Sequence, residues 1–137
     1  MITIEELGVL RDVAVGSDGH VVVEITPTYS GCPAMDAIRA DVLARLAEAG
    51  FDDAEVRLVL APAWTTDWIT GAGRAALQEH GIAPPHRAGL VPLTLSVRCP
   101  VCGSPDTYEI SRFGSTACKS LWACRSCLEP FDHVKAL

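Results

Sequence analysis

Six cysteines carry the clearest chemistry in this sequence, and four of them form two Cys-x-x-Cys pairs in the C-terminal part. The first pair is Cys99 and Cys102, and the second is Cys124 and Cys127. Two such turns, called knuckles below, are typical of a tetrahedral site in which each turn offers two thiolates to one metal ion. A short segment with little apolar core needs such a cross-link in order to fold. We therefore predict that these four cysteines bind a metal.

Zinc and iron both fit this spacing. A zinc site with four thiolates is a closed shell that stabilises a fold and leaves no open position for catalysis. Rubredoxin-like iron sites use the same two knuckles, so the spacing does not separate the two metals. We favour structural zinc over iron. Both are favoured over disulfides, because paired Cys-x-x-Cys motifs in a reducing compartment are more often metal ligands.

A fifth thiol, Cys32, lies in "TPTYSGCPAM", directly before Pro33 and the strongest helical pattern of the chain. We expect it at the helix N-cap, where free amides and the helix dipole favour an anion and lower the pKa of a thiol. Thr26 and Thr28 add hydroxyl groups nearby. Cys32 is then a buried cap, a metal or cluster ligand, or a nucleophile. The role of nucleophile is disfavoured, because no histidine or asparagine is obviously arranged to activate Cys32 for hydrolysis.

Two other features are candidates for auxiliary roles. Cys118 precedes Lys119 near the knuckles and is interpreted as a small buried residue or as an auxiliary thiol that exchanges with a ligand. Trp64, Asp67 and Trp68 lie in a loop after a predicted strand. This loop either clamps onto the core or forms a docking surface for another protein.

The elements that must position these residues are indicated by local patterns. "RDVAV" and "HVVVEIT" flank "GSDG" and predict a β-hairpin; a helix follows over residues 33–49, ended by Gly50, and "AEVRLVLAP" predicts a third strand. A second helix is expected in "WTTDWITGAGRAALQEHG", with Thr66 as N-cap and a break at Gly71 and Gly73. The predicted fold is α+β, a small mixed sheet with packed helices in residues 1–85, followed by a linker and zinc ribbon in residues 86–137.

Composition narrows the function. The chain has 137 residues, is 49% hydrophobic and has a formal net charge of -6, so we expect no nucleic-acid partner. No run approaches the roughly 18 apolar residues of a membrane span. The acidic beginning, with Glu5 and Glu6, differs from a signal peptide. We expect a cytoplasmic protein that does not contact a membrane.

Three blocks of the chain resemble a known family. "LGVLRDV", "ITPTYSGCPAMDAI" and "LAPAWTTDWITGAGRAALQEHGIAPP" are similar to the SufT-like iron-sulfur assembly domain. "RCPVCGS", "SRFGSTACKSLWAC" and "CLEPFD" resemble the ribbon extension of its PaaD branch, which is associated with bacterial phenylacetyl-CoA epoxidase. The resemblance covers nearly the whole chain. It places Thr26, Thr28 and Cys32 in the family's cysteine motif and the four knuckle cysteines in its ribbon.

The resemblance implies an accessory or maturation protein for the multicomponent di-iron oxygenase that epoxidises phenylacetyl-CoA in phenylacetate degradation. It implies structural zinc, transient iron or an iron-sulfur cluster, and as partners the other epoxidase subunits or iron-sulfur assembly proteins. Catalysis would lie in other subunits; this chain shows no Glu-x-x-His pairs and no dinucleotide-binding fingerprint. The alternatives are a docking subunit without metal transfer and a rubredoxin-like electron carrier. A homodimer that shares a metal at the helix N-terminus is a further option.

The chain departs from the family pattern at both ends. The family's acidic Asp-Pro-Glu stretch would precede the "LG" block at Leu7, so we expect that part of the site to be missing or truncated. The family's further cysteine after "FDYFK" is replaced by Ala136 in "FDHVKAL". This replacement favours the four knuckle cysteines as the complete ligand set.

Overall fold

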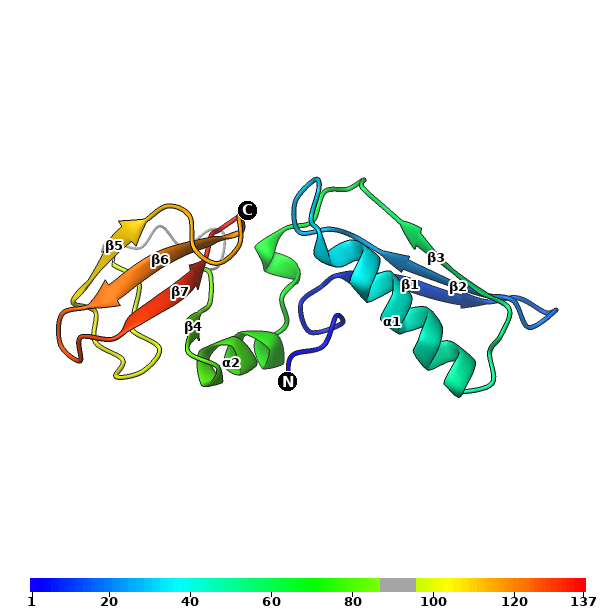
Figure 1. Ribbon diagram of the computed structural model, residues 1–137, viewed down its shortest axis with the longest axis horizontal. Helices are drawn as coiled ribbons and strands as arrows, with labels where there is room; N and C mark the ends of the chain where they lie inside the picture. Colours follow the sequence, from blue (N-terminus) through cyan, green and yellow to red (C-terminus); the bar gives the residue numbers. More distant parts are fainter. Residues whose placement is uncertain (87–95) are drawn as a thin grey trace.

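The protein consists of two lobes arranged along its long axis, with a helix between them (Figure 1). This computed structural model describes residues 1–86 and 96–137. The N-terminal lobe holds β1 (Leu10–Val15), β2 (Val21–Ile25), α1 (Ala34–Glu48) and β3 (Ala54–Leu58). The C-terminal lobe holds β4 (Ile82–Ala83), β5 (Thr107–Ser111), β6 (Lys119–Cys124) and β7 (Pro130–Val134). The predicted α+β class is confirmed.

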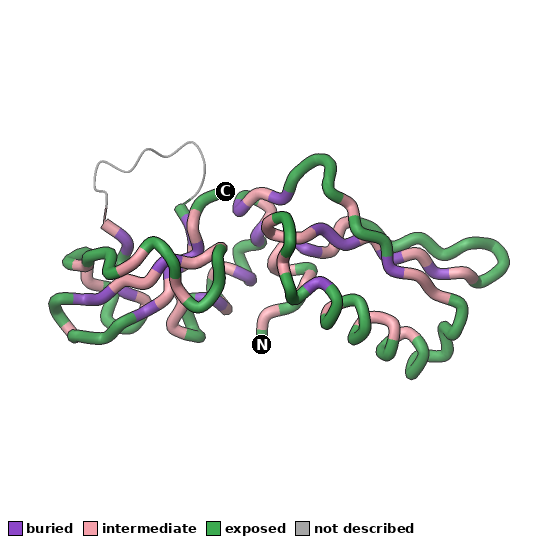
Figure 2. Tube along the Cα trace, turned by 45° about the horizontal axis from the view of Figure 1, so that its top comes forward, coloured by how far each residue is buried: buried purple, intermediate pink, exposed green. Residues whose placement is uncertain are grey.

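The N-terminal lobe is a mixed sheet of order β1-β2-β3, in which β1 and β2 form the predicted antiparallel hairpin and β2 and β3 are parallel. Val21, Val23 and Ile25 alternate along β2 and are buried, as the period of two in a strand requires. They pack with Met35 of α1, so one helix covers one face of this sheet. Figure 2 shows buried positions within this lobe and also in the C-terminal lobe and at the junction between them.

The helix α1 ends as predicted but begins two residues after Cys32. Gly50 has φ +92°, and its N–H and that of Phe51 donate to the carbonyls of Ala47 and Leu46, which is the Schellman arrangement. At the other end Pro33 is the N-cap, with no side-chain hydrogen bond to the helix. The prediction of Cys32 as N-cap is therefore wrong by one residue, since Cys32 lies just before the capping Pro33.

The segment after β3 differs from the predicted broken helix. A short 3₁₀ helix (Thr66–Trp68) is capped by Thr65, and α2 (Gly71–Glu79) is a separate helix capped by Thr70. The prediction of Thr66 as N-cap is wrong, and Gly71 begins the helix rather than breaking it. Gly73 is required for packing, because an added Cβ would collide with the carbonyl of Glu6.

The two lobes meet at a small apolar cluster. Trp64, Ile69, Leu77 and Val134 are buried together there. The indole N–H of Trp64 also donates to the carbonyl of Leu7 over 3.0 Å. This cluster links the N-terminal turn, α2 and the last strand.

The C-terminal lobe is a four-stranded sheet of order β4-β7-β6-β5. β5, β6 and β7 are antiparallel neighbours, as a ribbon requires, and β4 pairs with β7 in parallel. The predicted linker runs into residues 87–92, which lie outside the described residues, and the boundary at residue 85 stays a prediction. Among the described residues, no helix is both long enough and apolar enough to cross a bilayer.

Candidate metal centre and thiol-lined cavity

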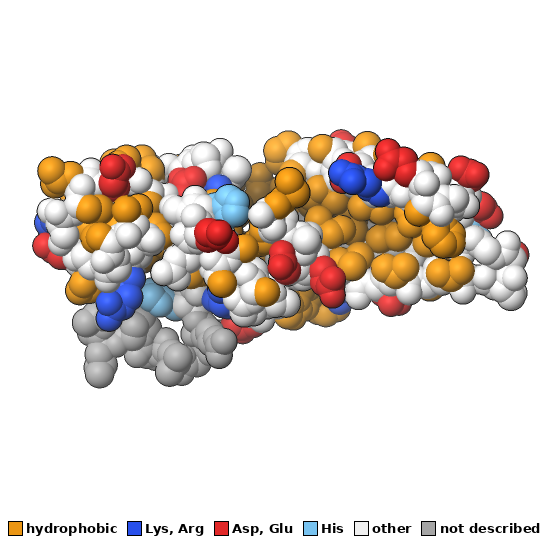
Figure 3. All heavy atoms as spheres, turned by 90° about the horizontal axis from the view of Figure 1, so that it is seen from below, with side chains coloured by type: hydrophobic (Ala, Val, Ile, Leu, Met, Phe, Trp, Pro, Cys, Tyr) orange, Lys and Arg blue, Asp and Glu red, His pale blue; other side chains and the backbone are white. Residues whose placement is uncertain are grey.

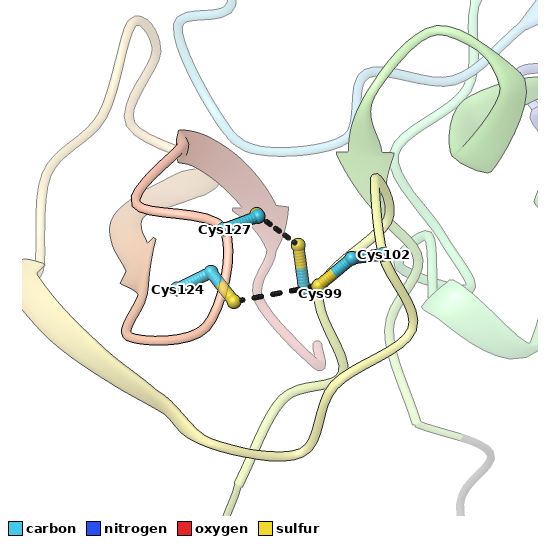
Figure 4. Close-up of side chains that lie close together, drawn as sticks. All are labelled: Cys99, Cys102, Cys124 and Cys127. Carbon is cyan, nitrogen blue, oxygen red and sulfur yellow. Dashed lines mark hydrogen bonds between the residues drawn. The ribbon is translucent and has the colours of Figure 1, made fainter.

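The four knuckle cysteines converge on one point of the C-terminal lobe (Figure 4). The sulfur of Cys99 lies 3.7 Å from that of Cys127, and the sulfur of Cys102 lies 3.6 Å from that of Cys124. All four ligand atoms lie within 4.8 Å of one another. All four thiols are free. Within the part of the chain that the structure describes, this is the only group of three or more candidate metal ligands.

This spacing fits a tetrahedral thiolate site. With metal–sulfur bonds of about 2.3 Å, the edge of the tetrahedron is roughly 3.8 Å, close to the two shortest sulfur–sulfur distances. A disulfide would require about 2.05 Å. Cys99 and Cys124 are 1% exposed, whereas Cys102 is exposed. The donor set therefore suits a thiophilic metal held in a closed shell.

The two knuckles share one backbone pattern. The N–H groups of Cys99 and Cys124 donate to carbonyls five residues later, and their carbonyls accept from N–H groups four residues later. The residues at that fourth position are Gly103 and Leu128, which have φ +75° and +66°. The left-handed conformation at Leu128 is unusual for a residue with a side chain. Both knuckles thus have a left-handed residue directly after their second cysteine.

Backbone amides prepare one knuckle sulfur to be a thiolate. The amides of Cys127 and Ser126 lower the pKa of Cys124 to about 6, and the Ser126 N–H lies 3.3 Å from that sulfur. The amide of Glu129 acts in the same direction on Cys127, but burial and the hydrogen bonds to the other thiols raise the pKa of Cys127 to about 12. Metal binding at such a group displaces the protons that remain on its thiols.

The second candidate site is a cavity of about 330 Å³ at the meeting point of the lobes. Cys32 and Thr28 line it from the N-terminal lobe, and Cys118 lines it from the C-terminal lobe. Most of the other lining side chains are apolar, among them Met35 and Trp64. Sequence reasoning proposed Cys32 and Cys118 separately but did not bring them together, because nothing local relates two cysteines so far apart in the chain.

The remaining predicted site residues lie outside the group of four knuckle cysteines. Thr26 is 1% exposed, and its hydroxyl has no hydrogen-bond partner among the described residues; it is absent from the cavity lining. Trp64 is 7% exposed and packs in the cluster between the lobes, as expected of a side chain that clamps the loop to the core; its use in docking stays a prediction. Trp68 is half-buried beneath the guanidinium of Arg11, 4.3 Å from its ring, and Asp67 is exposed. Docking through Asp67 and Trp68 stays a prediction.

Comparison with known proteins separates the chain into the same two parts. Residues 2–58 match the family of iron-sulfur cluster assembly proteins, and residues 83–135 match the PaaD zinc beta ribbon domain. A protein of Escherichia coli strain K12, provisionally named as one of the subunits of 1,2-phenylacetyl-CoA epoxidase, is 46% identical over 141 residues. The match covers 100% of this chain and 83% of that relative.

Shorter relatives match about half of the chain. The Fe-S protein maturation auxiliary factor SufT of Staphylococcus aureus strain USA300 is 36% identical, over 56% of this chain and 88% of its own length. A maturation auxiliary factor of Porphyromonas gingivalis is 33% identical, over 50% of this chain and 67% of its own length. The crystal structure of a domain of unknown function, DUF59, from Bacillus anthracis superposes with a TM-score of 0.51 at 29% identity, over 54% of this chain and 72% of that one.

Proposed function

This chain belongs to the PaaD family, and from that premise we propose that it assists the assembly of iron or an iron-sulfur cluster in the phenylacetyl-CoA epoxidase system. Its relatives are named as an epoxidase subunit and as iron-sulfur maturation factors, which supports an accessory rather than a catalytic role. The observation that carries the proposal is the position of Cys32. This free thiol belongs to the part of the chain that matches the assembly family, and it lines the cavity at the meeting point of the lobes.

In this proposal the metal or cluster is cargo. The thiolate of Cys32 binds it as one ligand, and an acceptor ligand on the client protein then replaces that thiolate. One iron–sulfur bond breaks as one bond to the acceptor forms, and the oxidation state of the iron does not change. The Cys32 thiolate takes the proton that the acceptor ligand loses as it binds. No group of three or more candidate ligands includes Cys32 among the described residues, and such an incomplete shell favours release.

The ribbon has a different task in this proposal. Its four sulfurs form a complete ligand shell, and zinc in such a shell stabilises a fold without exchanging readily. Zinc is supported by the match to the PaaD zinc beta ribbon domain. The zinc site then stabilises the ribbon strands β5, β6 and β7. Residues of the same lobe form one wall of the thiol-lined cavity.

The experiment is complementation in cells that depend on the epoxidase. A strain lacking this chain receives the wild type, Cys32→Ala or the neighbouring control Ser30→Ala, and phenylacetyl-CoA consumption is measured. We expect Cys32→Ala to fall to the level of the deletion strain while Ser30→Ala supports wild-type consumption. Equal amounts of protein in the three strains separate lost function from lost folding. Wild-type consumption with Cys32→Ala overturns the role of the cysteine.

A second candidate function is favoured by the name of one relative, which calls it a subunit of the epoxidase. A structural subunit would dock onto other epoxidase subunits without handling metal. In that case Cys32→Ala supports normal consumption, and substitutions at the exposed Asp67 or half-buried Trp68 abolish co-purification with the other subunits. The same strains therefore distinguish the two functions.

A further inference from the structure

Leu128 follows the second knuckle in a backbone conformation that leucine rarely adopts. Its φ is +66°, and its N–H donates to the carbonyl of Cys124 over 3.1 Å. A Cβ atom is crowded in this left-handed region, so a leucine there costs free energy that a glycine does not. The first knuckle has Gly103 at the same position, with φ +75° and its N–H on the carbonyl of Cys99. The turn itself therefore needs no side chain at this position.

The side chain of Leu128 does not contribute to the core of the ribbon. It is 79% exposed. Among the described residues, it belongs to none of the buried clusters and is not one of the side chains packed against them. An exposed leucine gains little from the hydrophobic effect. A costly backbone conformation that presents an apolar side chain to solvent points to a contact outside this chain.

The first knuckle carries a second exposed apolar side chain. Val101 lies between the two cysteines of this turn and is 61% exposed. The two turns face each other across the four sulfurs (Figure 4), and the hydroxyls of Ser104 and Ser126 lie 2.8 Å apart between them. The metal-bearing end of the ribbon thus presents apolar side chains from two turns that one metal centre joins. Val101 and Leu128 are called the knob below.

Arg98 adds a positive charge to this end of the ribbon. Its side chain is exposed, and its guanidinium donates to the carbonyl of Gly103 over 3.1 Å, which holds it against the first turn. Arg125 of the second knuckle pairs with Asp106, whereas no carboxylate among the described residues pairs with Arg98. An exposed arginine without a carboxylate partner suits a carboxylate on another protein.

We propose that the knob docks the ribbon onto the client protein, with Leu128 as the central contact in an apolar pocket that a carboxylate facing Arg98 borders. Apolar side chains with a charged rim are the usual anatomy of such a contact. The inference rests on the proposed function, in which the client is a subunit of the epoxidase. It gives the metal of the ribbon a second consequence, because the metal fixes the two turns that carry the knob.

The first test asks whether the fold needs the leucine. Leu128→Gly and Leu128→Asn both suit a left-handed residue. We expect both variants to bind one zinc per chain and to melt at the wild-type temperature or slightly above it. Lost zinc, or a melting temperature lowered by more than about 3 °C in both variants, would show that the leucine serves the fold and would overturn the inference.

The second test measures docking. A tagged copy of this chain is co-expressed with the epoxidase subunits in the deletion strain, and the co-purified subunits are quantified. We expect about tenfold less with Leu128→Asn, as for a central apolar contact, and a smaller loss with Arg98→Gln. The control is Leu60→Asn, at a leucine that is 66% exposed after β3, which should match the wild type. Undiminished co-purification of Leu128→Asn overturns the inference, as does a wild type that retains no epoxidase subunit.

Cys32→Ala distinguishes this inference from the proposed function. It leaves the knob intact, so it should co-purify with the subunits as the wild type does, although it fails in complementation. Leu128→Asn should fail in complementation while it retains one zinc per chain. If Leu128→Asn supports wild-type consumption of phenylacetyl-CoA and Cys32→Ala does not, docking through the knob is wrong and the proposed function stands. The opposite pattern contradicts the role of Cys32 and leaves docking through the knob in place.

Discussion

The knuckle sulfurs share one centre but differ in their surroundings. Cys124 accepts a hydrogen bond from a backbone N–H and is almost completely buried, whereas Cys102 is exposed. Removing a buried ligand leaves three thiols that must still share one ion, and metal binding in such small domains is largely equivalent to folding. The energetic importance of each cysteine therefore depends on the metal rather than on the apolar area it buries.

We expect Cys124→Ser to lower the zinc content from one per chain to well below one and to unfold the C-terminal lobe. The matched control is Ser126→Ala, two residues away, which loses only the exposed hydroxyl contact with Ser104 and should change the free energy of unfolding by no more than about 0.5 kcal/mol. Metal analysis and thermal unfolding measure both. Full zinc occupancy in Cys124→Ser would contradict the four-thiolate site.

Residue types and spacing alone predicted this metal centre, because two knuckles bring their own turns with them and need little from the rest of the chain. The cavity was not predictable in the same way. Cys32 and Cys118 come to line one cavity only through the packing of two lobes around Trp64 and Val134. A pattern that is local in sequence cannot contain that information.

At the scale of elements, β2 organises the N-terminal lobe. It lies at the centre of its sheet, and its alternating buried residues made it predictable. The predicted break of α2 was wrong because glycine was interpreted as a helix breaker, whereas Gly73 serves the close approach of α2 to Glu6. The glycine at position 73 is thus explained by a tertiary contact, which a local sequence pattern does not reveal. The strand β3 is also shorter than predicted. It ends at Leu58, which is 51% exposed, although the alternation of apolar residues continues to Leu60.

An ion pair joins the start of β2 to the start of β3. Nδ1 of His20 lies 2.9 Å from a carboxylate oxygen of Asp53, and this hydrogen bond raises the pKa of His20 above its usual value of 6.5. Desolvation acts in the opposite direction, and the charges of Asp53, Glu55 and Asp18 add to the effect of the hydrogen bond, so that the pKa of His20 is raised overall. Protonated His20 therefore stabilises the folded lobe. That contribution is complete below the unfolded pKa and is lost as pH rises through the folded pKa.

We expect Asp53→Asn to move the pKa of His20 back toward 6.5, as measured by NMR titration of its ring protons. The wild type should lose stability as pH rises through the raised pKa, and the variant should show a weaker dependence there. Asp52→Asn, a neighbouring exposed carboxylate with no ion pair to His20 among the described residues, is the control. An unchanged His20 titration in Asp53→Asn would mean that the pair does not form.

At the scale of the whole molecule, the two lobes have different sources of stability. The N-terminal lobe has an aliphatic core under α1, and hydrophobic side chains also spread over its outer surface (Figure 3). The buried cluster of the C-terminal lobe includes two of the metal-binding cysteines. The junction around Trp64 depends on both lobes, since Val134 belongs to β7.

Removal of the metal should therefore act on one lobe first. With a zinc chelator, we expect amide hydrogens of β5, β6 and β7 to exchange rapidly while those of β2 remain protected, as measured by hydrogen–deuterium exchange. The thiol-lined cavity should open at the same time, making Cys32 more reactive toward alkylation. Simultaneous loss of protection in β2 would show that the lobes unfold as one unit.

The measurement that tests the central claim most directly is the zinc and iron content of anaerobically purified protein, compared between the wild type and Cys32→Ala. The account predicts one zinc per chain in both, with less than one iron per chain in the wild type and none in the variant. Zinc without iron in the wild type, or the same iron content in the variant, would contradict iron handling at Cys32. Iron in place of zinc would instead indicate an electron carrier.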